Sequence, residues 1–236
     1  MKYPDDYINK IICGDCLEVM KGIPDKSVDL VLTSPPYNLG DNHHTGTIRH
    51  NPYDDNLYEH DYQNLQVKLL KECFRVLSEH GSLFYNHKNR IKEGVMITPY
   101  QWIFKTEFAL KQELVWFNGS QNFDKVRFYP MTERVYWLGK AILGKTNFTN
   151  NINHHDYFEW KPEGTEKIHK RAFPLSLPMS ILQCFPNNSV VLDPYCGSGT
   201  TAVACKELGM KYVGIEQNPE YIEIAQRRLS QEYLFT

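Results

Sequence analysis

The pattern of apolar and polar positions predicts alternating strands and helices over most of the chain. Short apolar runs, which are typical of buried strands, occupy residues 8–13, 28–33, 82–86, 112–117, 133–138, 190–192 and 211–215. Helical spacing and helix-stop residues predict helices over residues 16–22, 62–77, 102–110, 176–185, 200–208 and 219–229. Strands that alternate with helices are typical of βαβ units. We therefore expect an α/β fold in which a mostly parallel sheet carries helices on both faces.

Two segments interrupt this alternation. Residues 38–60 lack periodicity and are rich in Asn, His, Asp and Gly, and a loop of this length in a compact domain is commonly a functional lid. Residues 140–171 are polar, contain several asparagines and show little periodicity. No internal repeat or low-complexity tract accompanies them, so we expect residues 1–236 to form a single domain.

Composition places the chain among ordinary globular proteins. Of its 236 residues, 42% are hydrophobic and 23% are charged. No apolar stretch reaches the length of a membrane span, and the first residues lack the layout of a signal peptide. We therefore expect no membrane partner and a cytoplasmic location. The net charge of −2 argues against non-specific coating of nucleic acid, although it allows a local basic groove.

The six cysteines do not follow a metal-binding pattern. Cys13 and Cys16 have the spacing of a ligand pair, but no second such pair and no histidine pair at zinc-finger spacing accompany them. The spacing of His43, His44 and His50 also fits no closed zinc site. The sequence therefore predicts reduced thiols and no metal.

A stiff corner follows the apolar run 28–33. Pro35 and Pro36 fix two consecutive φ angles and lack amide hydrogens, and Ser34 is pushed toward an extended conformation because a proline follows it. Such a corner can direct carbonyl oxygens toward a flat amine while the ring of Tyr37 stacks on the plane of that amine. A proline-rich turn that only closes a strand is the alternative interpretation.

Residues 190–216 combine a strand, a glycine-containing loop, a helix and a further strand. Gly197 and Gly199 permit a tight turn and close approach of the backbone to a ligand. Glu216 ends the next strand, where an acidic side chain can bind both hydroxyls of a ribose. The combination predicts a ribose-bearing cofactor.

Two cofactors compete for this loop. NAD is one of them, because Gly197, Gly199 and Ala202 also match the dinucleotide-binding spacing. Asp193 favours S-adenosylmethionine instead, since an acid before the loop suits a cationic amino-acid group and would oppose a pyrophosphate. The loop is also offset from the strand end by three residues, whereas a dinucleotide turn normally starts there. S-adenosylmethionine is the preferred interpretation.

Together, these motifs resemble those of the DNA amino-methyltransferases, which methylate the exocyclic amine of cytosine (N4) or adenine (N6). Residues 193–201 (Asp-Pro-Tyr-Cys-Gly-Ser-Gly-Thr-Thr) resemble the cofactor motif of that family, and residues 33–37 (Thr-Ser-Pro-Pro-Tyr) resemble its catalytic motif. The catalytic motif comes first, as in the β group of the family, which has a permuted motif order. The resemblance covers nearly the whole chain. It implies a Rossmann-like S-adenosylmethionine-dependent methyltransferase fold and an activity of the type II restriction-modification kind.

The resemblance also implies roles for individual residues. The catalytic residues that it implies are Ser34, Pro35, Pro36 and Tyr37. The cofactor-binding residues that it implies are Asp15, His169, Phe173, Asp193, Tyr195, Gly197, Ser198, Gly199, Thr200, Thr201 and Glu216. One departure is that the family often has His-Pro at the start of the segment that closes over the cofactor, whereas here Lys170 follows His169.

The predicted reaction is a direct transfer of a methyl group to an exocyclic amine. Ser34 and the carbonyl of Pro35 would accept hydrogen bonds from the amine, which localises its lone pair for attack. The target base would leave the DNA helix and stack on Tyr37. Serine at the first corner position is typical of N4-cytosine enzymes in this family, and Asp or Asn is typical of N6-adenine enzymes. Cytosine is therefore preferred, with adenine and a catalytically silent DNA-binding relative as alternatives.

The sequence indicates the DNA contacts less directly. The basic residues that we expect to contact DNA are Arg49, Lys161, Lys167, Lys170 and Arg171. The first lies in the expected lid, residues 38–60, and the others lie in residues 140–171, which we expect to form a small target-recognition region. The expected partner is double-stranded DNA, and a cognate restriction endonuclease and a second copy of the chain are further candidates.

Overall fold

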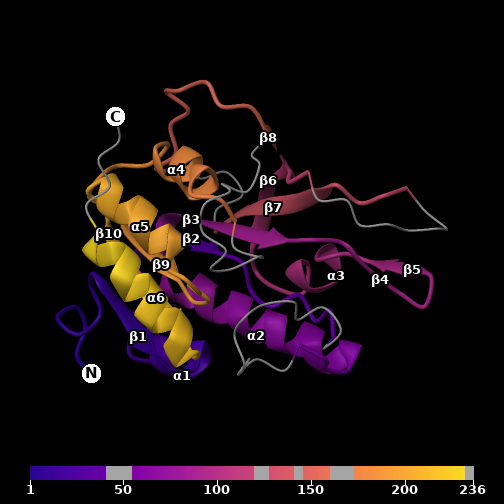
Figure 1. Ribbon diagram of the computed structural model, residues 1–236, viewed down its shortest axis with the longest axis horizontal. Helices are drawn as coiled ribbons and strands as arrows, with labels where there is room; N and C mark the ends of the chain where they lie inside the picture. Colours follow the sequence, from indigo (N-terminus) through magenta and orange to yellow (C-terminus); the bar gives the residue numbers. More distant parts are fainter. Residues whose placement is uncertain (41–54, 120–127, 141–145, 160–172, 232–236) are drawn as a thin grey trace.

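The computed structural model describes residues 1–40, 55–119, 128–140, 146–159 and 173–231. Within this part of the chain, eight strands form one sheet in the order β1-β10-β9-β2-β3-β7-β6-β8 (Figure 1). These strands are β1 (Lys10–Cys13), β2 (Val28–Thr33), β3 (Leu77–His87), β6 (Ala109–Phe117), β7 (Thr132–Gly139), β8 (Tyr157–Glu159), β9 (Val190–Asp193) and β10 (Lys211–Glu216). A separate two-stranded hairpin consists of β4 (Arg90–Lys92) and β5 (Val95–Ile97).

The half of the sheet from β1 to β3 is parallel throughout. The strand β7 then runs antiparallel to both β3 and β6, and β8 pairs in parallel with β6. Strands such as β2 are buried along almost their whole length. A parallel sheet is covered on both faces, so the side chains on both sides of a strand are buried. This explains why such strands are nearly continuous apolar runs in the sequence.

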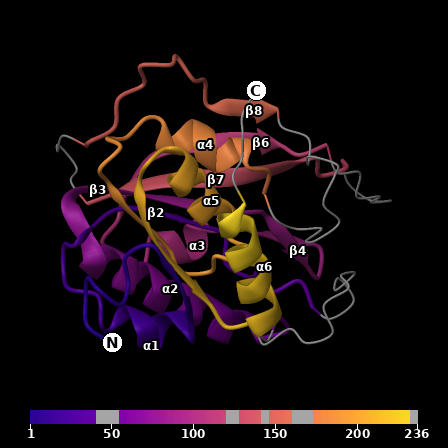
Figure 2. The same cartoon turned by 60° about the vertical axis from the view of Figure 1, so that its left-hand side comes forward.

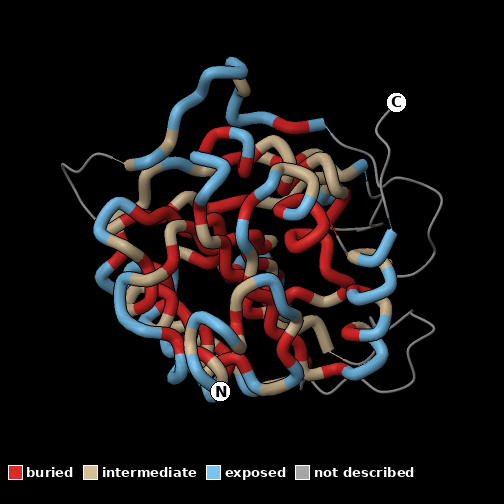
Figure 3. Tube along the Cα trace, turned by 90° about the vertical axis from the view of Figure 1, so that its left-hand side faces the viewer, coloured by how far each residue is buried: buried red, intermediate tan, exposed pale blue. Residues whose placement is uncertain are grey.

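The helices cover the two faces of the sheet (Figure 2). One group comprises α1 (Cys16–Met20), α2 (Glu59–Val76) and α3 (Tyr100–Ile103), and the other comprises α4 (Ser176–Leu182), α5 (Thr200–Glu207) and α6 (Pro219–Ser230). The first group shares one apolar cluster with the sheet, and α4 and α5 share a second cluster with the opposite face. The buried residues gather in the centre of the molecule, with exposed residues around them (Figure 3). The predicted α/β fold with helices on both faces is confirmed.

One predicted helix is wrong, and two short elements were not predicted. The helix predicted over residues 102–110 is wrong, because only the single turn of α3 forms and β6 already begins at Ala109. Pairing of β6 with β7 over almost its full length outweighs the weak local helical pattern. The hairpin of β4 and β5 and the strand β8 were not predicted, since each has only three residues and too few positions to show a period.

The order in which successive strands are added to the sheet reverses between β9 and β2. From β2 the chain leads through α2 to β3 on one side, and from β9 it leads through α5 to β10 on the other side. In open α/β sheets, ligands bind at such a point, beyond the carboxyl ends of the strands, because the loops diverge there. Both motifs singled out in the sequence follow these two strands. Within the described residues, no helix combines the length and apolar character that crossing a membrane requires.

Candidate cofactor and catalytic site

The glycine loop connects β9 to α5 through a tight turn. Within this turn, the amide of Gly199 donates to the carbonyl of Cys196 over 2.8 Å. Gly197 and Gly199 have φ angles of +50° and +79°, in the left-handed region that glycine tolerates best. A Cβ on Gly199 would lie 2.8 Å from the Cβ of Ala225 in α6. The second glycine is therefore required both for the turn and for the close packing of α6 against the loop.

Asp193 stabilises this loop from inside. Its side chain is 4% exposed, and its carboxylate accepts hydrogen bonds from the amide of Tyr195 at 3.1 Å and the hydroxyl of Thr201 at 2.6 Å. Burial raises the pKa of Asp193 to about 6, although these two hydrogen bonds act in the opposite direction. The carboxylate therefore links the start of the loop to the first turn of α5.

Glu216 lies beneath the loop at the end of β10. It is 2% exposed, and its two carboxylate oxygens accept from the amide of Gly197 at 2.9 Å and the amide of Asn218 at 2.8 Å. Each carboxylate oxygen has a second lone pair. Glu216 can therefore hold the loop in place and still accept hydrogen bonds from a ligand above it.

Asp15 lies at the end of the neighbouring strand. The strands β1 and β10 pair in parallel, with Cys13 opposite Glu216, so both acids follow the same edge of the sheet. Asp15 caps α1 by accepting from the amides of Leu17 and Glu18. Its other oxygen accepts from the Gln217 side chain at 2.8 Å. The structure thus brings Asp15 and Glu216, two of the three acids that the sequence assigned to the cofactor, to the same edge.

Arg228 is a component of this site that sequence analysis missed. From α6, its Nη1 donates to the carbonyl and the hydroxyl of Ser198 at 2.8 and 3.1 Å and to the hydroxyl of Thr200 at 3.0 Å. The predicted roles of Ser198 and Thr200 remain predictions, but their hydroxyls contact Arg228. An arginine on a later helix carries no local signal of such a contact, because only the tertiary fold places α6 behind the loop.

The proline corner continues directly from β2. Pro35 is buried, whereas Ser34, Pro36 and Tyr37 are half-buried. The hydroxyl of Tyr62, on α2, lies 2.8 Å from the carbonyl of Pro36 and 2.6 Å from Nε2 of His87. These contacts hold the corner beside the long helix.

Polar side chains from two further strands surround the corner. The hydroxyls of Ser34 and Tyr37 lie 2.9 Å apart, and Tyr37 donates to Oε2 of Glu133, at the start of β7, over 2.9 Å. Asn86, at the end of β3, donates from Nδ2 to the Tyr37 hydroxyl at 2.9 Å. Asn118 donates to Oε1 of Glu133 at 3.2 Å. Glu133 and Asn118 were missed as site residues, since an antiparallel strand brings them to the corner from far along the chain.

Two titratable groups at the corner, Tyr37 and His87, are held neutral. Burial, followed by the nearby charge of Glu133, raises the pKa of Tyr37 well above its ordinary value. Burial also lowers the pKa of His87 to about 3, so the imidazole that lies 4.5 Å from the Tyr37 ring carries no charge at neutral pH. The ammonium of Lys88 lies 5.9 Å from the centre of the same ring.

Two further predicted residues pack against the apolar clusters. Phe173 is 8% exposed and belongs to the apolar cluster on the α4 and α5 face. Tyr195 is half-buried and packs against the cluster on the opposite face. The predicted residues that lie outside the described part of the chain are Arg49, Lys161, Lys167, His169, Lys170 and Arg171. Within the described part, no group of three or more His, Cys, Asp or Glu side chains is arranged to hold a metal ion.

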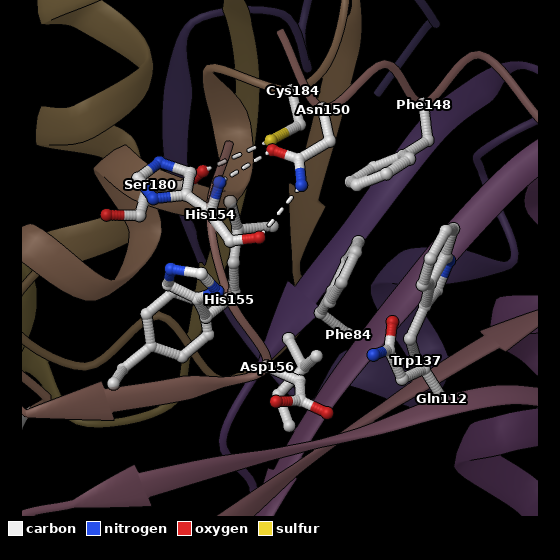
Figure 4. A pocket seen from close by; sticks show the side chains of 13 residues that line it. Phe84, Gln112, Trp137, Phe148, Asn150, His154, His155, Asp156, Ser180 and Cys184 are labelled. Atoms are coloured by element: carbon white, nitrogen blue, oxygen red, sulfur yellow. Dashed lines mark hydrogen bonds between the residues drawn. The ribbon is translucent and has the colours of Figure 1, made fainter. Parts of the chain in front are cut away.

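A pocket of about 140 Å³ lies elsewhere, between the sheet and α4 (Figure 4). Aromatic side chains such as Phe84 and Trp137 line it, together with His154 and Cys184. Pockets that bind small molecules usually exceed about 300 Å³. None of the predicted catalytic or cofactor residues lines this pocket, so it is separate from the site at the strand ends.

Comparison with known proteins agrees with this geometry. A family model described as DNA methylase, N6_N4_Mtase, matches residues 28–227. The type II methyltransferase M.HinfI of Haemophilus influenzae is 30% identical over 95% of this chain and 69% of its own length. The type II methyltransferase M.HpaI of Haemophilus parainfluenzae is 29% identical over 95% of this chain and 75% of its own length.

Solved structures show the same fold. The PvuII DNA methyltransferase (cytosine-N4-specific) superimposes with a TM-score of 0.78 at 20% identity and covers 96% of this chain and 88% of its own. The complex of M1.HpyAVI with SAM superimposes with a TM-score of 0.68 at 21% identity, over 94% of this chain and 99% of its own. The predicted methyltransferase fold is therefore confirmed.

The strand ends also fit the cofactor of such enzymes. A Cβ on Gly197 would meet no atom within 4 Å, so the loop backbone is open to a ligand on that side. Asp15 and Glu216 lie along the same edge, where acids suit an adenine amine and ribose hydroxyls. The cofactor is S-adenosylmethionine, as predicted. The chain belongs to the N6/N4 DNA methylase family, as a relative of the type II methyltransferases.

Proposed function

We propose that this DNA methyltransferase transfers a methyl group from S-adenosylmethionine to the N4 amine of a cytosine that has been flipped out of double-stranded DNA. The observation that carries the proposal is the position of Ser34. Its hydroxyl follows β2 at the switch point of the sheet, beside the strand that leads into the glycine loop. A serine at this first corner position is typical of the N4-cytosine enzymes of the family.

The chain's own residues would mainly position the reacting groups. S-adenosylmethionine supplies a methyl group on a sulfonium. Ser34 Oγ and the carbonyl of Pro35 accept the hydrogens of the target amine, which localises the nitrogen lone pair for attack. Tyr37 offers its ring to the flipped base, whose release from the duplex costs a few kcal/mol. Asp193 and Glu216 hold the loop that would carry the cofactor.

N6-adenine is the second candidate, and one feature of the corner favours it. Ser34 is surrounded by an amide and a carboxylate, because Asn86 Nδ2 lies 3.3 Å from Ser34 Oγ and also contacts Glu133. Asp or Asn is the typical corner residue of the N6-adenine enzymes. Here the same chemical groups reach the corner from neighbouring strands.

The base is tested by incubating the protein with double-stranded DNA and S-adenosylmethionine labelled in its methyl group. Hydrolysis of the DNA and separation of the nucleosides is expected to give labelled N4-methylcytosine. Labelled N6-methyladenine alone would refute the cytosine proposal. The Ser34→Ala variant is the matched control, because it should bind S-adenosylmethionine normally in calorimetry while losing most of the methyl transfer.

We also propose that residues 38–60, of which Glu59 and His60 already belong to α2, form a lid against DNA. The two ends of this loop are joined beside the corner, since Asn38 exchanges hydrogen bonds with the backbone of Leu57 and its amide donates to Asp55 at 2.6 Å. The loop therefore starts and ends next to Tyr37. Replacement of Arg49 by alanine should weaken DNA binding in a salt-dependent way and leave cofactor binding unchanged.

The remaining proposals concern organisation and partners. Residues 1–236 would act as one methyltransferase domain in which residues 140–171 recognise the target sequence. The likeness to type II methyltransferases supports a cognate restriction endonuclease in the same system. A homodimer is the proposed oligomeric state, which ultracentrifugation of the purified protein would test.

A further inference from the structure

The hydrogen bonds around Ser34 have a direction that Glu133 imposes. An ionised carboxylate only accepts hydrogen bonds, so the single hydroxyl hydrogen of Tyr37 points to Glu133 Oε2. The oxygen of Tyr37 then acts as the acceptor toward Ser34 Oγ, 2.9 Å away. Ser34 therefore donates its hydrogen to Tyr37, and its lone pairs remain available as acceptors.

Asn86 reinforces the same direction. Its Nδ2 donates to the Tyr37 hydroxyl at 2.9 Å and lies 3.3 Å from both Ser34 Oγ and Glu133 Oε2. If the amide were rotated by half a turn, its oxygen would face three oxygen atoms. In the observed orientation Asn86 donates most closely to Tyr37, which agrees with Tyr37 directing its own hydrogen to Glu133.

We propose that Ser34, Tyr37 and Glu133 form a proton relay in which Glu133 is the final acceptor of the proton released by the methylated amine. This inference rests on the proposed function, because it assumes that the corner binds an exocyclic amine. It goes beyond that function by assigning a route to the proton. Glu133 acts through the other two residues and is therefore a positioning residue and a proton acceptor at a distance.

The step balances in atoms and charge. The nitrogen–carbon bond forms while the carbon–sulfur bond of the sulfonium breaks, and its electron pair stays on sulfur. The amine proton passes to Ser34 Oγ, the former hydroxyl proton of Ser34 passes to Tyr37, and that of Tyr37 passes to Glu133 Oε2. One positive charge on sulfur and one negative charge on the carboxylate disappear together, which leaves a neutral methylated amine.

The environment of Tyr37 favours a concerted transfer. Because burial and the charge of Glu133 raise the pKa of Tyr37, a free tyrosinate would be costly. Tyr37 therefore passes a proton on as it receives one. Glu133 is half-buried, so its carboxyl group can return the proton to solvent after the product leaves.

Other charged and titratable groups near the relay do not replace Glu133. His87 lies against the Tyr37 ring and is neutral, because its pKa is lowered to about 3. Lys88 approaches that ring with an ammonium, which accepts no proton. Arg134 follows Glu133 in β7 but forms an ion pair with Glu113 at 2.6 Å. Of the described residues around the corner, Glu133 is the carboxylate that contacts Tyr37.

The test compares Glu133→Gln with a matched control, Glu113→Gln. Glu113 also accepts a tyrosine hydroxyl, that of Tyr100, and lies on the adjacent strand β6, outside the corner. Single-turnover methylation of DNA is measured from acid to neutral pH for both variants and for Glu133→Asp. Binding of S-adenosylmethionine and of DNA is measured by calorimetry on the same samples. The ¹³Cζ resonance of Tyr37, assigned with Tyr37→Phe, reports its hydrogen bond in the free protein.

We expect Glu133→Gln to lower the single-turnover rate about 100-fold or more, as general-base removal does, while both affinities change by less than about threefold. The wild-type rate should fall at acid pH, and this acid limb should be absent in Glu133→Gln. Glu133→Asp should restore part of the rate together with the acid limb. The Tyr37 resonance should shift in Glu133→Gln and stay unchanged in Glu113→Gln.

Several results would overturn the relay. One is a Glu133→Gln rate that stays within about threefold of wild type, and another is a lowered rate that keeps the wild-type acid limb. A loss of the same size in Glu113→Gln would show that the effect is not specific to the corner. The wild-type product separates this inference from the proposed function. Methylated adenine would refute the choice of base and leave the relay standing, whereas no transfer at all would overturn both.

Discussion

Replacement of Gly199 by alanine tests how the glycine loop is held against α6. The new Cβ would lie 2.8 Å from the Cβ of Ala225 and 3.2 Å from its Cα. Ala225 is fully buried in α6, so relief of this contact requires α6 or the loop to shift. The backbone at Gly199 also has a φ of +79°, which a residue with a Cβ adopts only at a cost.

The magnitude follows from these two effects. The left-handed backbone costs about 1–2 kcal/mol for an alanine, and an overfilled contact in a packed core costs about 1–3 kcal/mol. We therefore expect the free energy of unfolding to fall by about 3 kcal/mol. With a urea slope of about 3 kcal/mol per M, the midpoint of unfolding moves down by about 1 M.

Gly197→Ala is the matched control. Gly197 has a similar φ of +50°, but a Cβ there would meet no atom within 4 Å. Only the backbone cost remains, so we expect a loss of about 1 kcal/mol. Urea unfolding of both variants, followed by circular dichroism, measures the difference between them.

A double-mutant cycle isolates the contact with α6. The double variant Gly199→Ala, Ala225→Gly lacks the Cβ of residue 225 that the new methyl group would meet. Its loss in free energy of unfolding should be about 1 kcal/mol smaller than the sum of the losses of the two single variants. Equal losses for Gly197→Ala and Gly199→Ala, or a cycle that is additive within about 0.3 kcal/mol, would refute the reasoning from close packing.

Two further predictions concern the same loop. Because the pKa of Asp193 is raised from 3.8 to about 6, its stabilising contribution is present below about pH 4 and is lost as the pH rises through about 6. The free energy of unfolding of wild type minus that of Asp193→Asn should therefore fall by about 2 kcal/mol between pH 4 and pH 7 in urea titrations; a constant difference would contradict the burial argument. Replacement of Arg228 by alanine removes its hydrogen bonds to the loop and should weaken S-adenosylmethionine binding about tenfold in calorimetry. The exposed neighbour Arg227 provides the control, and equal effects of the two changes would count against a role of Arg228 in holding the loop.

Much of the fold could be predicted from local pattern. Continuous apolar runs predicted the central strands, because a strand covered on both faces needs apolar side chains at every position. The region from 90 to 117 was predicted less well. There the hairpin of β4 and β5 is short, and β6 is a strand because β7 pairs with it rather than because of its own spacing.

The site divides in the same way. Ser34, Asp193 and Glu216 could be predicted, since each directly follows or ends a strand and the order of strands in an α/β fold brings such positions to one edge. Glu133 and Arg228 could not, because their contacts depend on an antiparallel strand and a late helix whose positions no local pattern encodes.

The sequence by itself determined the α/β class, the glycine loop and the proline corner, because glycine and proline restrict the backbone locally whatever surrounds them. Only the tertiary structure decided what faces these motifs. It directs Asp193 and Glu216 inward to hold the loop, and it sets Asn86 and Glu133 around Ser34. Hydrogen bonds between distant strands depend on register and burial, and these exist only once the sheet has formed.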